Sequence, residues 1–178
     1  MTNGDPLLLD ACGCINLAAA FPLESLSADL GRPIYIVEQA ASETLFLHRQ
    51  IDGERVKVQI DLGAIPALRL DGDRELELYV RLAKRLGDGE AASLAISHCR
   101  QLELVTDDRT ARKVAGREAP NARIRGTAEI LKALATSMAP PDDEVARALR
   151  RVESYASFRP PHDDPELSWW LSAREFAE

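Results

Sequence analysis

The sequence predicts an α/β protein, a three-layer α/β/α sandwich with a central, mainly parallel sheet. Short apolar runs at residues 7–9, 33–37 and 102–106 are typical of strands that are buried on both faces. Longer segments with helical spacing of their apolar residues alternate with these runs. The alternation favours parallel strands, because each helix carries the chain back across the sheet before the next strand begins.

Local signals predict the remaining elements. Residues 38–49 carry apolar side chains at helical spacing, which predicts one continuous helix. Residues 56–60 alternate between apolar and polar, which suits a half-buried strand at an antiparallel edge. Further helices are expected at residues 17–20, 23–30, 71–86, 90–100, 108–115 and 127–135. Further strands are expected at residues 67–70 and 122–125. The helix that ends near residue 86 is expected to bury the face formed by Leu76, Tyr79, Val80, Ala83 and Leu86.

Two consecutive prolines divide the chain into two parts. Residues 1–139 are expected to form the α/β domain, and residues 140–178 a helical C-terminal extension. The extension is predicted to contain helices at residues 144–157 and 166–176. The Trp169–Trp170 pair is too large to leave in water, so the extension is expected to pack on the domain or on a partner.

Composition limits the classes of function. The chain has 178 residues and is 46% hydrophobic, which indicates a globular domain rather than a disordered segment. Its net charge of -7 provides no general attraction for nucleic acid, so a nucleic-acid substrate would need a local basic patch or a bound cation. The apolar run at residues 7–23 is interrupted by Asp10 and Asn16, which argues against a signal peptide or membrane span and favours a cytoplasmic protein.

Acidic residues follow two of the predicted strands. Asp10 ends the first apolar run, and Asp107 and Asp108 follow the run at residues 102–106. Glu90 opens a helix after a glycine-rich loop. Carboxylates that meet at the carboxyl ends of parallel strands repel one another, and a hard divalent cation such as Mg²⁺ or Mn²⁺ relieves that repulsion. Taken alone, each acid has an alternative role as a helix cap or first-turn residue.

Three stretches resemble the hallmark segments of the PIN-domain superfamily: LLLDACGCINL, LGDGEAASLAI and LVTDDRTARKVA. They are most similar to the bacterial branch that includes VapC-type toxins and stand-alone PIN proteins. The resemblance implies a PIN-like α/β/α sandwich and an Mg²⁺- or Mn²⁺-dependent ribonuclease. It also implies homodimers and, in many relatives, an antitoxin that wraps the site.

The same resemblance implies roles for individual residues. Asp10, Glu90 and Asp108 match the acids that hold the metal, and Asp107 is a possible extra ligand. The remaining acid of the family is matched by Glu43, with Glu38 as its rival. Polar positions that line the pocket are matched by Asn16 and Thr106, each of which has an alternative role as a helix cap or an internal hydrogen-bonding group. Arg109 and Arg112 follow Asp108 on one helix, where they either bind RNA phosphates or form a solvated surface.

Two hypotheses of different kinds remain open. The first is a metal-dependent endoribonuclease acting on RNA, whether or not it is the toxin of a toxin–antitoxin pair. The second is a non-catalytic PIN-like module that binds another protein. The second hypothesis rests on the acidic charge, the added extension, and Gly13, which can loosen the turn after Asp10. A phosphatase with an Asp-x-Asp nucleophile is disfavoured, because Cys12 occupies the second position.

Overall fold

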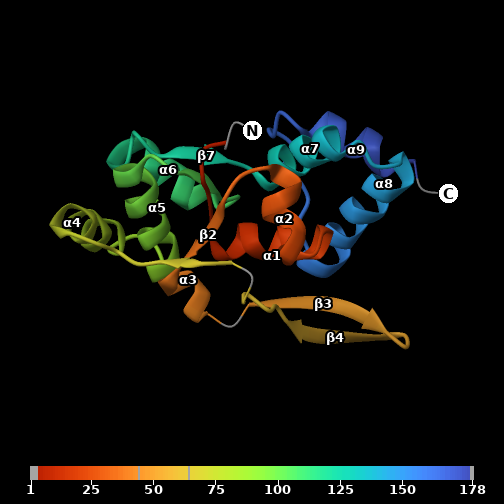
Figure 1. Cartoon of the computed structure of the whole chain (residues 1–178), viewed down its shortest axis with the longest axis horizontal. Helices are drawn as coiled ribbons and strands as arrows, with labels where there is room; N and C mark the ends of the chain where they lie inside the picture. The colour runs from red at the N-terminus through yellow and green to blue at the C-terminus, as the bar shows by residue number, and fades with distance from the viewer. Residues whose placement is uncertain (1–3, 44, 64, 177–178) are drawn as a thin grey trace.

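The computed structural model describes residues 4–43, 45–63 and 65–176. Its centre is a five-stranded sheet in the order β5-β2-β1-β6-β7, in which every neighbouring pair is parallel. The α/β/α class is therefore confirmed (Figure 1). The strands are β1 (Leu7–Leu9), β2 (Ile34–Val37), β5 (Ala67–Leu68), β6 (Glu103–Val105) and β7 (Arg123–Arg125).

Helices cover both faces of this sheet. In Figure 1, α1, α2 and α7 lie on one side of the central strands, and α3 to α6 lie on the other. These helices are α1 (Ala11–Ala20), α2 (Leu23–Leu30), α3 (Glu38–Ser42), α4 (Asp73–Leu82), α5 (Asp88–Arg100), α6 (Arg109–Glu118) and α7 (Thr127–Met138). The two helical layers bury the three central strands β1, β2 and β6, which is why these strands are mostly apolar.

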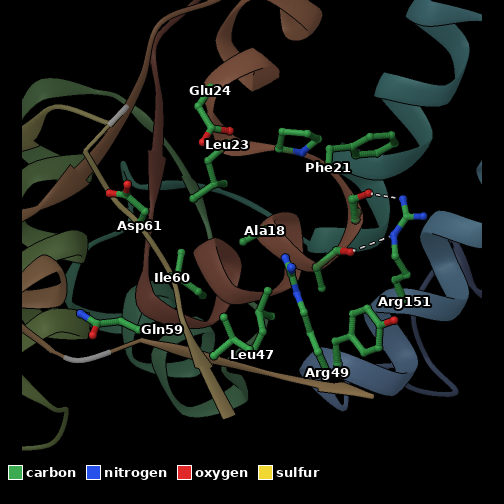
Figure 2. Close-up of a pocket in the computed structure, with 15 residues that line it drawn as sticks. Ala18, Phe21, Leu23, Glu24, Leu47, Arg49, Gln59, Ile60, Asp61 and Arg151 are labelled. Atoms are coloured by element: carbon green, nitrogen blue, oxygen red, sulfur yellow. Dashed lines mark hydrogen bonds between the residues drawn. The ribbon is translucent and has the colours of Figure 1, made fainter. Parts of the chain in front are cut away.

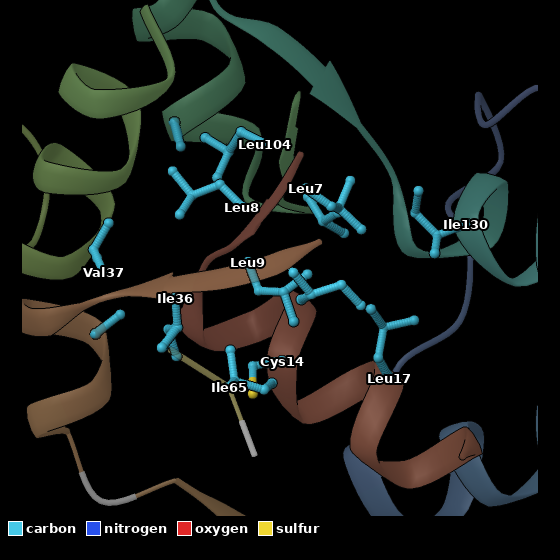
Figure 3. Packing of buried hydrophobic residues seen from close by; sticks show 14 of the residues in the cluster. Leu7, Leu8, Leu9, Cys14, Leu17, Ile36, Val37, Ile65, Leu104 and Ile130 are labelled. Atoms are coloured by element: carbon cyan, nitrogen blue, oxygen red, sulfur yellow. The ribbon is translucent and has the colours of Figure 1, made fainter. Parts of the chain in front are cut away.

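The central strand β1 has no exposed side chain. Leu7, Leu8 and Leu9 are all 0% exposed, because successive side chains point to opposite faces and both faces are covered. Figure 3 shows Leu8 beside Leu104 under α5, whereas Leu9 lies toward α1. Such burial fixes the position of the residue that follows β1, which is Asp10.

The helix predicted at residues 38–49 is wrong beyond Ser42. The chain instead forms strand β3 (Phe46–Ile51), which pairs antiparallel with β4 (Glu54–Gln59). Burial alternates along this segment, with Leu45 and Leu47 buried and Phe46 and His48 only partly so. The strand predicted near residues 56–60 is confirmed, but it belongs to a separate two-stranded ribbon rather than to an edge of the main sheet.

Helix α4 turns toward the core a face that its apolar residues do not predict. Leu78 and Leu82 are buried together with Glu75, whereas Leu76 and Val80 are 46% and 57% exposed. Burial would raise the pKa of Glu75, but two hydrogen bonds from Arg100 of α5, at 2.7 and 2.8 Å, hold it below its usual value. The prediction that Leu76 and Val80 are buried is therefore wrong.

The C-terminal extension packs on the domain of its own chain. It contains α8 (Asp142–Arg151), a π-helical turn η1 (Val152–Ala156) and α9 (Leu167–Arg174). Trp170 is 0% exposed, packs edge-on against Phe158, and donates its indole N–H to Glu153. Both of these Trp170 partners belong to the extension itself, whereas α8 and η1 contact α1 and α9 contacts α7 of the domain. The domain boundary at residue 139 stays a prediction.

Across the described ranges, no single helix has the length and apolar character to cross a membrane; α1 and α2 meet those criteria only as a pair bent by 92°.

Candidate functional site

Asp10 lies at the carboxyl end of the central strand and caps α1. Its Oδ1 accepts a hydrogen bond from the Gly13 backbone N–H at 2.5 Å, and its side chain is also hydrogen-bonded to Thr106. The residue is 2% exposed. Burial, together with the charges of Asp107 and Glu90, raises the pKa of Asp10 from 3.8 to about 7, although the two hydrogen bonds oppose the shift.

Gly13 makes the turn after Asp10 tight rather than loose. A Cβ added at this glycine would lie 2.7 Å from the Val105 carbonyl oxygen and 3.0 Å from Asp10 Oδ1. Only glycine lets the first turn of α1 approach the end of β6 this closely. The expectation that Gly13 loosens the turn is therefore wrong, and the glycine instead brings the ends of β1 and β6 together.

Asp107 is held by hydrogen-bond donors from two helices, α7 and α1. Thr127, which begins α7, donates its backbone N–H to Asp107 Oδ1 at 3.0 Å and its hydroxyl to Oδ2. Asn16 of α1 donates to Oδ2 at 3.1 Å and to the Thr127 hydroxyl at 3.0 Å. Burial raises the pKa of Asp107, although these bonds and the charge of Arg112 oppose the shift. Asn16 and Asp107 are thus brought together, as the sequence predicted.

Thr127 is the polar residue at this rim that sequence reasoning missed. It is 0% exposed and follows strand β7 by two positions. Its position in the sequence could have identified it, because a polar residue just after a strand that neighbours β6 in a parallel sheet lies at the same edge of that sheet. Thr106, which was predicted, is 1% exposed and links Asp10 to the Asp108 backbone N–H, which donates to its hydroxyl at 3.2 Å.

Asp108 and Glu90 each lie at the start of a helix at this rim, Asp108 as the N-cap of α6 and Glu90 in the first turn of α5. Asp108 caps α6, accepting the Ala111 N–H at 2.6 Å. Glu90 folds back to accept the Gly87 N–H at 3.2 Å at the start of α5. Burial raises the pKa of Glu90, the bond from Gly87 opposes the shift, and the charges of Asp108 and Glu43 add to it. Asp108 and Glu90 therefore each accept a backbone hydrogen bond at a helix start and also lie in the electrostatic environment of the other acids.

The structure separates the two candidates for the remaining acid. Glu43 lies beside α5, where its Oε1 comes within 2.8 Å of the position that a Gly89 Cβ would take, and its charge acts on Glu90. Glu38 instead forms an ion pair at 2.9 Å with Arg69. Glu43 faces the acidic rim, and Glu38 is engaged elsewhere.

The charges of four acids at this rim act on Cys12. The residue has an exposed surface, yet burial of its thiol and the charges of four carboxylates together raise its pKa to about 12. Those carboxylates belong to Asp10, Glu90, Asp107 and Asp108.

The donor set fits a hard divalent cation in chemistry. Carboxylate oxygens are the ligands that Mg²⁺ and Mn²⁺ prefer, and a cation would offset both the burial of the Asp10 charge and its repulsion by Asp107 and Glu90, which raise the pKa of Asp10. As the side chains stand, however, no three His, Cys, Asp or Glu residues of the described segments are close enough to hold one ion together. Binding therefore requires some of the carboxylates to turn inward.

The two predicted arginines lie differently. Arg112 donates to the Thr106 carbonyl oxygen at 2.8 and 3.1 Å, which stabilises the loop that carries Asp107. Arg109 is exposed and pairs with Asp163 of the extension at 3.2 Å. The structure thus brings Arg112 to the acidic rim and turns Arg109 toward the extension.

A family model described as PIN domain matches residues 7–161. The chain is a PIN-domain protein. The matched range begins at β1 and includes every acid of the rim as well as α8 and η1. No curated protein and no solved structure shows significant similarity to the chain.

Proposed function

We propose that this PIN-domain protein is a divalent-metal-dependent endoribonuclease that hydrolyses RNA phosphodiester bonds. The observation that carries the proposal is Asp10, a carboxylate buried at the end of the central strand whose strongest charged neighbours are themselves acidic. A protein that only needed a helix cap would not require Asp107 and Glu90 to share that environment. A bound Mg²⁺ or Mn²⁺ accounts for all three.

The proposed ligands are Asp10, Glu90, Asp107 and Asp108. A metal bound here supplies a Lewis acid that polarises a phosphate and activates water. The chain's own contribution is orientation. Gly13 and Thr106 hold one side of the Asp10 carboxylate, and Thr127 and Asn16 hold that of Asp107.

Glu43 is proposed to position the attacking water. Its carboxylate stands beside α5 and acts on Glu90, and it is more exposed than the other acids. An exposed carboxylate next to a metal ligand can accept a hydrogen bond from incoming water without a large desolvation cost. Arg112, engaged with the Thr106 carbonyl, supports the loop and sets the local positive charge for an RNA phosphate.

The first test is calorimetric titration of Mn²⁺ into wild-type protein and into Asp10→Asn, with RNA cleavage measured on the same samples. We expect wild type to bind Mn²⁺ and cleave RNA, and Asp10→Asn to lose cleavage by at least ~100-fold. Full activity in Asp10→Asn would refute the assigned role.

Glu43→Gln and Glu38→Gln form a matched pair. We expect Glu43→Gln to lower kcat and Glu38→Gln to leave it unchanged, because Glu38 is paired with Arg69. The reverse result would exchange the two assignments.

The partners suggested by the resemblance stay predictions. A homodimer is supported by the exposed apolar pair Leu76 and Val80 on α4, which a second copy could cover. Sedimentation of Val80→Arg, compared with wild type, tests this contact. An antitoxin and a cytoplasmic location remain proposals without a structural observation of their own. The alternative hypothesis, a non-catalytic module, proposed the Trp169–Trp170 pair as a surface for a partner protein. Trp170 is fully buried within the chain and so offers no surface to a partner.

A further inference from the structure

The β3–β4 ribbon has two chemically different faces. In the antiparallel register His48 stands opposite Lys57, and Gln50 opposite Arg55, so these side chains share one face. Leu47, Arg49 and Val58 point the other way, where they line a cavity of about 680 Å³ over the end of α1. Figure 2 shows Leu47 and Arg49 turned toward Ala18. We name the first set the outer face: Phe46, His48, Gln50, Arg55, Lys57 and Gln59.

The outer face is basic in an acidic protein. It carries Arg55, Lys57 and His48. The structure describes every residue from 46 to 59, and none of the residues of this range on the outer face is Asp or Glu. The two acids of the ribbon are Asp52 in the turn and Glu54 on the inner face. This is the local basic surface that a chain with a net charge of -7 needs in order to attract nucleic acid.

An aromatic ring lies among these cations. The Lys57 ammonium stands 3.8 Å above the centroid of the Phe46 ring. Phe46 is partly exposed and does not belong to the hydrophobic core or to the side chains packed against it. Its role in the core is therefore small, and the flexible Lys57 side chain over its ring can swing aside.

The base of the ribbon adjoins the acidic rim. β3 begins three residues after Glu43, and a cavity of about 400 Å³ between them is lined by Glu43, Leu45 and Gln59, among others. Figure 1 shows the ribbon leaving the body beside α3 and extending under α1. A strand of nucleic acid on the outer face would thus end near Glu43.

We propose that the outer face of β3–β4 binds single-stranded RNA and leads it to the acidic rim. Lys57 and Arg55 contact backbone phosphates, and Phe46 stacks on a base after Lys57 moves from its ring to a phosphate. The Arg55 hydrogen bond to Ser157, exposed and 3.4 Å long, is replaced in the complex. This inference rests on the proposed ribonuclease function, for which it supplies the path of the substrate.

A second copy of the chain is a poorer occupant. Two copies could also pair antiparallel through their β4 strands about a two-fold axis. In that arrangement odd-numbered residues lie opposite odd-numbered residues, so Arg55 and Lys57 of one copy would lie opposite Arg55 or Lys57 of the other. That repulsion disfavours self-association through β4. A phosphate chain has the opposite charge and meets no such penalty.

The test is fluorescence anisotropy of a labelled 12-nucleotide oligouridine, with Asp10→Asn as the parent so that the probe stays intact. The ribbon variant adds Arg55→Ala and Lys57→Ala. The control variant adds Arg81→Ala and Lys84→Ala, two exposed cations near the end of α4 with the same loss of charge. We expect the ribbon variant to bind roughly tenfold more weakly and its salt slope to fall by about 1.4, at ~0.7 per phosphate contact. The control is expected to stay near the parent.

Phe46→Ala separates stacking from charge. We expect it to weaken binding without changing the salt slope, and Phe46→Trp to retain binding. The inference is overturned if the parent does not bind the probe, or if the ribbon and control variants weaken equally. Metal-dependent cleavage by wild type is scored separately. If wild type cleaves RNA but the ribbon variant binds the probe as tightly as its parent, the proposed RNA path is refuted and the nuclease function is not. If the ribbon variant binds more weakly but wild type does not cleave RNA, the nuclease function is refuted.

Discussion

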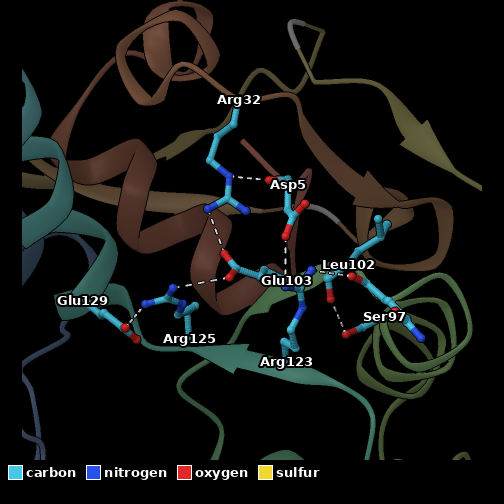
Figure 4. A network of polar contacts seen from close by, with 9 residues as sticks. Asp5, Arg32, Ser97, Leu102, Glu103, Arg123, Arg125 and Glu129 are labelled. Carbon is cyan, nitrogen blue, oxygen red and sulfur yellow. Dashed lines mark hydrogen bonds and ion pairs between the residues drawn. The ribbon is translucent and has the colours of Figure 1, made fainter. Parts of the chain in front are cut away.

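The two rims of the central sheet both bury carboxylates but neutralise them differently. At the amino ends of the strands, Glu103 of β6 forms ion pairs with Arg32 at 2.8 Å and Arg125 at 3.3 Å (Figure 4). Burial would raise the pKa of Glu103, but these arginines hold it below its usual value. At the carboxyl ends, burial and acidic neighbours raise the pKa of Asp10 to about 7.

The difference separates an acid that arginines of the same chain neutralise from one whose charged neighbours are acidic. Both residues are less than a tenth exposed, so burial alone does not distinguish them. The distinction lies in what compensates the charge: arginines of the same chain at one rim, and hydrogen-bond donors with further acids at the other. A buried acid whose charged neighbours are acidic is a candidate ligand for a bound cation.

The largest expected effect is on the pH dependence of stability without metal. Because the pKa of Asp10 is higher in the folded than in the unfolded chain, its stabilising contribution is complete below pH 3.8 and falls as the pH rises to about 7. We expect wild type in chelator to lose up to about 4 kcal/mol relative to Asp10→Asn between pH 4 and 7. Urea unfolding at each pH measures the free energy of unfolding of both proteins. The same pH dependence in wild type and Asp10→Asn would contradict the prediction.

Removing a cation from the other rim should cost nearly as much. Arg32→Met leaves Glu103 with only Arg125, and we expect a loss of about 3 kcal/mol at pH 7. Since the pKa of Glu103 is lowered, its contribution holds above pH 4.5 and disappears at lower pH, so the variant should differ less from wild type in acid. Arg147→Met, which breaks an exposed pair with Asp143, is the control and should cost under ~0.5 kcal/mol. Equal losses would show that burial does not matter.

The close approach that forms the acidic rim is tested by Gly13→Ala. The new Cβ would meet the Val105 carbonyl oxygen, which belongs to a buried strand and cannot move aside. We expect a loss of about 2 kcal/mol in the free energy of unfolding and weaker Mn²⁺ binding. Gly116→Ala is the matched control, because nothing lies within 4 Å of its Cβ position and alanine favours helix. It should be neutral or slightly stabilising.

The smallest effect is expected for the support of Asp107. Thr127→Val removes the hydroxyl that donates to Asp107 and accepts from Asn16, while the backbone bond remains. We expect a loss of about 1 kcal/mol and roughly tenfold weaker Mn²⁺ binding. Thr136→Val, on the exposed side of the same helix, should change neither quantity. Unchanged metal affinity in Thr127→Val would remove Asp107 from the proposed ligands.

The order of the buried strands could be predicted, whereas the segment at residues 38–49 could not. Leu7–Leu9 is too short and too apolar to be anything but a covered strand. At residues 45–48, apolar side chains satisfy helical spacing and strand alternation equally well, and tertiary packing of Leu45 and Leu47 decides between them. In α4, burial of Glu75 depends on Arg100, a long-range pairing that one sequence does not reveal.

For the site, the sequence predicted the acids but not how they are held. Asp10, Glu90 and Asp108 follow from their places after strands and at helix starts. Thr127 and the tight packing of Gly13 depend on which strands are neighbours, which the sequence constrains only through topology. The proposal of Glu43 rather than Glu38 likewise depends on an ion pair between Glu38 and Arg69.

Two hydrogen bonds at the end of α1 can form only after most of the chain has been synthesised. The last carbonyls of α1, those of Ala19 and Ala20, accept from Arg151, which lies 131 residues after Ala20. At about 5–20 residues per second, a ribosome adds this arginine roughly 7 to 26 seconds after the helix that it completes. Until then α1 ends without that partner, so the helix capped by Asp10 reaches its final form only late in translation.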